Sequence, residues 1–291
     1  MKTLPSLALF VALTAGVPAT AANLMLNFVS TSTNAAAAGN VTPDYSTLSP
    51  GHATGAIAGS QTTWNNLNST ASGPLKYADG SNAAGVNVTF SSEATAGSGI
   101  LSFTSPNLNL SALYGSGGGL ATNLYLNKDP LSIYGNGNNS SNFAVGRAGW
   151  LAGAANTAIG MRVDGLAASD YLIYVMARNT NSNAIAAPIN LFASAASSSN
   201  TFNFSGLTPA QQANSVYPAG DDTTAYNSFI QGENYVVMSV SLSPGQSLFL
   251  ASDGASPAEL RGFLNAVQIV AVPEPSALLL STLGLLAFVR R

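Results

Sequence analysis

YLIYVMA, residues 171–177, is an unbroken apolar run made mostly of residues that favour β-strands. A strand that is exposed on one face alternates apolar and polar residues, whereas a strand that is buried on both faces is continuously apolar. The run therefore predicts a central strand in a sheet that is covered on both sides.

Segments on either side of this run show the alternation of half-buried strands. Val86, Val88 and Phe90 are expected to face a core, and the polar residues between them to face solvent. Further strands are expected at residues 23–33, 100–104, 159–163, 189–195, 201–204, 235–242, 247–251 and 264–272. Asp164-Gly165 between two of these segments indicates a turn.

This series of strands, separated by Gly-, Asn- and Pro-rich turns, predicts an all-β body over residues 22–271. The absence of βα alternation favours one antiparallel β-sandwich, most simply a jelly roll. A parallel β-helix is the alternative, and it would need a regular repeat that the sequence lacks. One helical turn is expected at residues 208–211, where Thr208 caps, Pro209 takes the first helical position and Gln211 completes a capping box.

Residues 1–21 have the pattern of a secretory signal peptide. Lys2 supplies a positive charge, an apolar core follows at residues 7–15, and the small residues Ala19 and Ala21 mark a cleavage site. We expect signal peptidase to remove this segment during export.

Residues 272–291 combine Pro273-Glu274-Pro275, an apolar run over residues 276–289 and the pair Arg290-Arg291. The prolines separate the run from the body, because they cannot continue regular structure. As a helix the run would rise about 21 Å, short of the roughly 30 Å of a bilayer core. We therefore expect a short hydrophobic helix that anchors the chain transiently in the inner membrane, with the arginines on the cytoplasmic side. A plain C-terminal anchor and a buried core helix are the alternatives.

These three elements, in this order, resemble the PEP-CTERM sorting signal. The resemblance implies export in a Gram-negative bacterium, processing by the membrane protease exosortase, and a final location at the outer surface or in the extracellular matrix. Within the body, residues 264–270 resemble the closing strand of galactose-binding-like jelly rolls, and residues 170–175 resemble their central strand. This second resemblance supports the fold class and implies no site residues.

The composition excludes several classes of function. Charged residues make up 7% of the chain, with a formal net charge of −3 and no basic cluster, which argues against nucleic acid as a partner. The chain has no cysteine and one histidine, so a thiol nucleophile and a His-Glu-x-x-His zinc site are excluded. The histidine, His52, lies in a segment that we expect to be an exposed loop.

The candidate binding residues are few. Asp221 and Asp222 form the one local concentration of oxygen ligands for a structural Ca²⁺, and a solvated turn is the alternative. Trp64 and Trp150 are candidate platforms for stacking on sugar rings, and burial in the core is the alternative. No other cofactor and no catalytic residue is expected.

The expected function is a non-enzymatic role at the cell surface. The resemblance to the PEP-CTERM signal implies a role in the extracellular polysaccharide or biofilm matrix. Asn, Ser and Thr side chains match the hydroxyls of sugars, so a neutral or weakly acidic polysaccharide is the expected partner. An adhesin that self-associates through its sheet edges is a second hypothesis. A glycoside hydrolase is a third, and it would need two acids across one cleft, whereas Glu93, Glu233 and Glu259 lie in no recognisable motif.

Overall fold

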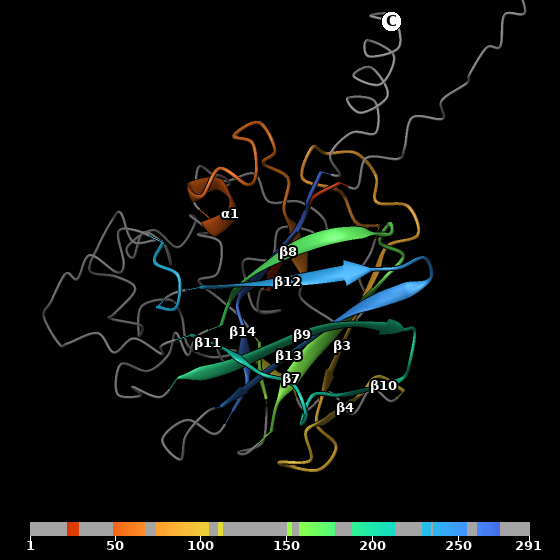
Figure 1. Cartoon of the computed structure of the whole chain (residues 1–291), viewed down its shortest axis with the longest axis vertical. Helices are drawn as coiled ribbons and strands as arrows, with labels where there is room; N and C mark the ends of the chain where they lie inside the picture. Colours follow the sequence, from red (N-terminus) through yellow and green to blue (C-terminus); the bar gives the residue numbers. More distant parts are fainter. Residues whose placement is uncertain are drawn as a thin grey trace, which may run out of the picture.

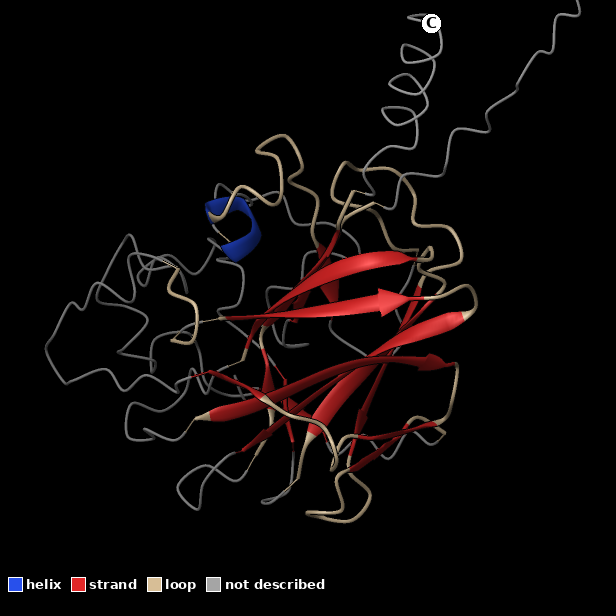
Figure 2. Ribbon diagram, viewed as in Figure 1, coloured by secondary structure: helices blue, strands red, loops and turns tan. Residues whose placement is uncertain are grey.

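The structure is a computed structural model of the chain (Figure 1). It describes residues 22–28, 49–67, 74–104, 110–112, 150–152, 157–177, 188–212, 229–233, 235–254 and 261–273. Within this part of the chain strands dominate, and one helical turn, α1 (Pro50–Ala53), is present (Figure 2). The predicted all-β class is confirmed.

Most strands belong to two five-stranded sheets, which form an upper and a lower layer in Figure 1. The first sheet has the order β12 (Val236–Leu242), β8 (Ser169–Met176), β15 (Ala266–Ala271), β1 (Leu24–Phe28) and β2 (Asn65–Leu67). The second has the order β11 (Ala210–Gln212), β9 (Ile189–Ser197), β13 (Gln246–Gly254), β7 (Ile159–Asp164) and β3 (Asn87–Ser92). Neighbouring strands are antiparallel except β1 and β2, which form a short parallel pair.

The connections between the sheets define the fold more closely. Without the edge strands β2 and β3, the first sheet contains β1, β15, β8 and β12, and the second contains β7, β13, β9 and β11. Along the chain these strands change sheet at every step except between β9 and β11. This is the strand order of two Greek keys in a jelly roll. The antiparallel sandwich is confirmed, while the resemblance to galactose-binding-like domains stays a prediction, because strand order fixes topology and not family.

The two sheets enclose one hydrophobic core. Leu24 and Phe28 of β1 and Val88 and Phe90 of β3 all point into it and are almost completely buried. The rings of Phe28 and Phe90 meet edge to face at 5.2 Å and connect the two sheets. Burial of each such side chain contributes about 1.5–3 kcal/mol to the stability of the fold. The inward-facing apolar residues of the alternating strands therefore hold the two sheets together.

The run at residues 171–177 forms most of β8, an inner strand between β12 and β15. Ile173 and Val175 point into the shared core. Tyr174 and Met176 point to the opposite face, where they belong to a second apolar cluster that the segment after α1 covers. The prediction of a strand buried on both faces is confirmed, although β8 lies one place from the edge of its sheet.

Two smaller sheets accompany the sandwich: β4 (Ile100–Ser102) with β10 (Thr201–Asn203), and β5 (Leu110–Ala112), β6 (Trp150–Ala152) and β14 (Phe263–Leu264). Strands β4 and β10 cover a third apolar cluster on the outer face of the second sheet, where the rings of Phe202 and Phe249 stack at 5.2 Å. This layer approaches so closely that a Cβ at Gly160 of β7 would collide with Leu101 and with the carbonyl oxygen of Leu250. An apolar cluster therefore fills the space between these two strands and the outer face of the second sheet.

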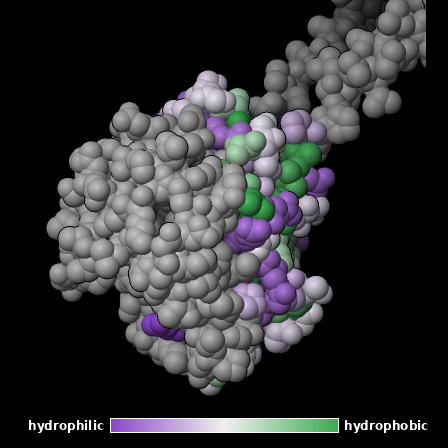
Figure 3. Space-filling model, turned by 90° about the vertical axis from the view of Figure 1, so that its left-hand side faces the viewer, coloured by the Kyte–Doolittle hydropathy of each residue, from purple (hydrophilic) through white to green (hydrophobic). Residues whose placement is uncertain are grey.

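The surface of the described residues exposes few large apolar side chains. Those exposed are Ile100, Leu207 and Val272. Figure 3 shows polar residues on most of the coloured surface, with hydrophobic residues in small green patches. The sandwich thus buries its apolar residues despite its low content of charge.

The helical turn expected at residues 208–211 is wrong, because strand β11 occupies Ala210–Gln212 and pairs with β9. The side-chain amide of Gln212 is buried, donates to the carbonyl oxygen of Ala177 at 2.7 Å and accepts from the Ala177 N–H at 3.0 Å. These two bonds tie the second sheet to the end of β8. They outweigh a local capping preference of about 1 kcal/mol.

Strand β15 lies inside the first sheet although it is the last of the described strands. Ile269 pairs with Leu24 of β1 on one side and with Ile173 of β8 on the other. Beyond the strand, the N–H of Val272 still donates to the carbonyl oxygen of Asp170 at 2.8 Å. The hydrogen bonds of the sheet therefore continue to the residue before the Pro-Glu-Pro segment.

Candidate functional site

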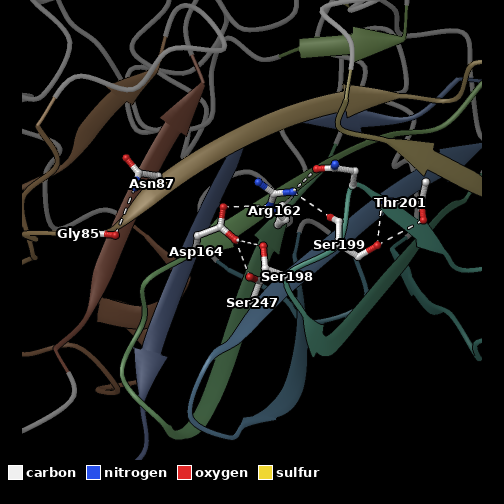
Figure 4. A network of polar contacts seen from close by, with 9 residues as sticks. Gly85, Asn87, Arg162, Asp164, Ser198, Ser199, Thr201 and Ser247 are labelled. Atoms are coloured by element: carbon white, nitrogen blue, oxygen red, sulfur yellow. Dashed lines mark hydrogen bonds and ion pairs between the residues drawn. The ribbon is translucent and has the colours of Figure 1, made fainter.

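Polar side chains gather where β7, β13 and the turn after β9 meet (Figure 4). Arg162 Nε donates to Asp164 Oδ2 at 2.9 Å, and Arg162 Nη1 donates to the carbonyl oxygen of Ser199 at 2.8 Å. The second carboxylate oxygen, Asp164 Oδ1, accepts from the hydroxyls of Ser247 at 2.5 Å and Ser198 at 3.4 Å. These five residues are named the Arg162 network below.

The Arg162 network lies on the outer face of the second sheet. Arg162 and Asp164 share this face because they are two positions apart on one strand, and their side chains are 14% and 25% exposed. A partly exposed ion pair of this kind contributes about 0–1 kcal/mol. Its main structural effect is to hold the turn after β9 against β7, with the guanidinium 5.6 Å from the centroid of the Phe103 ring.

The network and its surroundings carry groups that hydrogen-bond to neutral, hydroxyl-rich ligands. Asn87, Asn200 and Thr201 are exposed around it, and Asn200 Oδ1 accepts from Arg162 at 3.4 Å. Both oxygens of Asp164 accept hydrogen bonds, from Arg162 on one side and from Ser198 and Ser247 on the other.

Glu93, which follows β3, is buried and acts as a structural acceptor. Its Oε1 accepts from the N–H of Gly99 at 2.6 Å and from the hydroxyl of Ser98 at 3.3 Å. Its Oε2 accepts from the N–H of Ala158 at 2.8 Å. The carboxylate thereby joins the loop before β4 to the start of β7.

A second acid lies at the same end of the sheet. Asp253 of β13 is half-buried, and burial, followed by the negative charge of Glu93, raises its pKa to about 6. A pair of acids is what the hydrolase hypothesis requires. Backbone N–H groups hold both oxygens of Glu93, which gives this acid a structural role.

His52 lies in α1 and is half-buried, so the prediction of an exposed loop is wrong. Its Nε2 lies 2.9 Å from the carbonyl oxygen of Gln61. Because a carbonyl oxygen can only accept a hydrogen bond, Nε2 carries the proton of the neutral ring. The other ring nitrogen, Nδ1, then accepts from the Ser49 hydroxyl at 2.6 Å. Burial lowers the pKa of His52 and favours this neutral form. The hydroxyl of Ser49 also accepts from Gln268 of β15 at 2.8 Å, which fixes α1 on the first sheet.

Trp64 is fully buried, so the prediction that it stacks on sugars is wrong and the alternative of a core residue is correct. Its indole belongs to the apolar cluster on the outer face of the first sheet, together with Met25 and Tyr174. The backbone of Trp150 lies in β6, paired with Ala112 and Leu264. The structure describes the backbone of Trp150 but not its side chain, so the stacking role stays a prediction.

Several predicted site residues lie outside the described residues: Ala19, Ala21, Asp221, Asp222, Glu274, Pro275, Arg290 and Arg291. The short C-terminal helix expected at residues 276–289 lies outside them as well, while Pro273 is described and exposed. In the described ranges no group of three or more acidic or histidine side chains is arranged to hold a metal ion. None of the helical structure described there is long and apolar enough to cross a membrane.

Residues 271–291 match the family model of the PEP-CTERM protein-sorting motif. The predicted PEP-CTERM signal is thereby confirmed, and the chain is an exported protein that is targeted to exosortase and destined for the cell surface or the extracellular space. No curated protein matches the chain. The match begins at the last residue of β15, so the sorting motif follows the sandwich directly and leaves the role of the sandwich open.

The sequence interpretation missed the Arg162 network and the role of Glu93. Opposite charges two positions apart on an alternating strand were a usable signal for Arg162 and Asp164, because such residues share a face. Glu93 offered no local signal, since Ala158, whose N–H it binds, is 65 positions away.

Proposed function

We propose that the sandwich is a non-enzymatic module that associates with neutral extracellular polysaccharide and is brought to the surface by exosortase-dependent sorting. The observation that carries the proposal is the Arg162 network, a partly exposed cluster of guanidinium, carboxylate and hydroxyl groups with exposed amide and hydroxyl side chains around it. Planar polar groups of this kind match the paired hydroxyls of sugars.

Two further polar side chains of the described body support a non-catalytic role. Glu93 is used by backbone N–H groups, and His52 is used by Ser49 and Gln61. Low charge also favours a neutral ligand, because an anionic polymer would need a basic surface.

Binding of the exported protein to a panel of neutral and acidic polysaccharides tests the proposal. Dissociation constants in the millimolar to micromolar range are expected, equivalent to about −4 to −8 kcal/mol. The double variant Asn200→Ala/Thr201→Ala should weaken binding about fivefold, equivalent to about 1 kcal/mol. Gln211→Ala, an exposed substitution on β11, is the matched control and should bind as the unmodified protein does. Failure of the unmodified protein to bind, or equal binding by both variants, would overturn the proposal.

Self-association is a second candidate function, and a separate observation favours it. The edge strand β12 (sequence VVMSVSL) contains no charged residue and no proline, although natural proteins commonly protect their sheet edges with such residues.

A further inference from the structure

Strand β12 is an edge of the first sheet, and the bonds of β8 show which of its backbone groups face outward. The N–H of Val272 donates to the carbonyl oxygen of Asp170, so even-numbered residues of β8 bond toward β15 and odd-numbered residues toward β12. In the register of these strands, odd-numbered residues of β8 pair with even-numbered residues of β12. The N–H and C=O groups of Val237, Ser239 and Ser241 therefore point away from the sheet. These three residues are named the open edge.

Both ends of the open edge are closed by the chain itself. The carbonyl oxygen of Tyr235, which also points outward, accepts from the N–H of Gly232 at 2.7 Å. The N–H of Ser243 donates to Gln246 Oε1 at 2.8 Å. Between these two contacts, no strand in the described part of the chain pairs with the outer side of β12.

The side chains of the open edge permit another strand to approach. Ser239 and Ser241 are small and exposed, and Val237 is half-buried opposite Tyr174, where it packs against the second apolar cluster. An edge with β-forming residues, no charge and no proline is a template for pairing with another strand.

We propose that the open edge pairs in antiparallel fashion with the same edge of a second copy of this chain, with Ser239 on the two-fold axis. This arrangement places Ser239 opposite Ser239 and Val237 opposite Ser241, so every outward N–H meets a C=O and about six hydrogen bonds form. A second copy fits because the edge is complementary to itself and no like charges meet across it. The first sheets of the two copies become one continuous sheet. The inference gives a site to the self-association candidate and does not depend on polysaccharide binding.

The absence of cysteine from the chain allows a direct test. Hydrogen-bonded partners on antiparallel strands have Cα atoms about 5.5 Å apart, within the range that a disulfide spans. Oxidation of the exported Ser239→Cys variant is expected to give a disulfide-linked dimer. Ser241→Cys should give little dimer, because Val237 is its partner. Ser205→Cys, at an exposed position on the turn after β10, measures cross-linking by random collision.

Sedimentation equilibrium provides an independent measurement. The unmodified protein should associate as its concentration rises, Ser239→Lys should stay monomeric with an unchanged melting temperature, and Ser239→Thr should associate. A monomeric unmodified protein, or cross-linking at Ser239→Cys no greater than at Ser205→Cys, would overturn the proposal. Dimers without polysaccharide binding would support pairing of the open edge and reject the proposed function. Polysaccharide binding by a protein that stays monomeric would support the proposed function and reject pairing of the open edge.

Discussion

The backbone N–H of Ala271 donates to Asn23 Oδ1 at 3.0 Å, although the two residues are 248 positions apart. Asn23 directly precedes β1, and Ala271 ends β15. The beginning and the end of the sandwich therefore meet at one pole. The expected signal peptide (residues 1–21) precedes the body at this pole, and the sorting motif (residues 271–291) follows the body at the same pole.

Replacing Asn23 with Ala should destabilise the protein, because it leaves the N–H of Ala271 without its acceptor and removes a 2.8 Å bond to Gln61 Oε1. The expected loss is about 1–3 kcal/mol in the free energy of unfolding, measured by denaturant titration. Asn23→Asp keeps the acceptor and should lose less. Equal midpoints for Asn23→Ala and the unmodified protein would show that this contact does not contribute.

The pH dependence of stability should reveal the neutral state of His52. Its pKa in the folded protein lies below the ordinary 6.5, so the unfolded chain binds the proton more tightly. The contribution of His52 is therefore present above about pH 6.5 and is lost as the pH falls through the folded pKa. Protonation also converts Nδ1 from an acceptor to a donor toward Ser49. A parallel unfolding series with His52→Gln should lack this decline; identical pH profiles would contradict the assignment.

Asp253 should lower the stability of the protein as the pH rises, whereas His52 lowers it as the pH falls. Its pKa rises from 3.8 to about 6 on folding, so the stability that its protonated form contributes is present below about pH 3.8 and is lost as the pH rises through about 6. Asp253→Asn should therefore raise the free energy of unfolding at pH 7, by about 1 kcal/mol after allowance for solvent screening, and change it little at pH 3.5. A loss of stability at pH 7 would show that the carboxylate has a favourable partner.

Truncation of Trp64 tests whether this residue serves the core or binds polysaccharide. Trp64→Ala should cost about 3–5 kcal/mol because it opens a cavity in a fully buried cluster, and Trp64→Phe should cost less. Polysaccharide binding per folded molecule should not change in either variant. Reduced binding by folded Trp64→Phe would restore the stacking role.

The sorting motif predicts the fate of the chain in an exosortase-bearing host. Glu274→Ala, or deletion of Arg290 and Arg291, alters the motif at residues 271–291 and should leave the protein in the inner membrane. Cell fractionation and surface labelling measure the distribution, with Ser276→Ala as the control. Surface delivery of these variants at the level of the control would argue against exosortase recognition.

Local pattern was sufficient where the strand period decides the structure. The continuous run at residues 171–177 and the alternation at Val88 and Phe90 predicted which faces are buried, because side chains alternate along every strand. Pattern failed where a distant partner decides the structure. Gln212 follows a capping sequence but bonds to Ala177, 35 positions away.

The same limit applies to the candidate sites. Ser49, the hydrogen-bond partner of His52, also bonds to Gln268, which is 219 positions away from Ser49. The sequence around His52 gives no indication of the contact with Gln268. Trp64 is covered by folding of its own segment onto the outer face of the first sheet. A sequence pattern indicates that a residue is suited to a surface, but only the topology shows whether the surface is already occupied.

The inner position of β15 has a consequence for the order of events during export. Because β15 joins β1 to β8, the first strand of the body has no antiparallel neighbour until the last strand arrives, and such non-local pairing is slow. A chain that stops short of residue 266 lacks this strand and also lacks the motif at residues 271–291. Incomplete synthesis thus removes the closing strand and the delivery address together, so truncated products cannot fold to completion and cannot compete for exosortase.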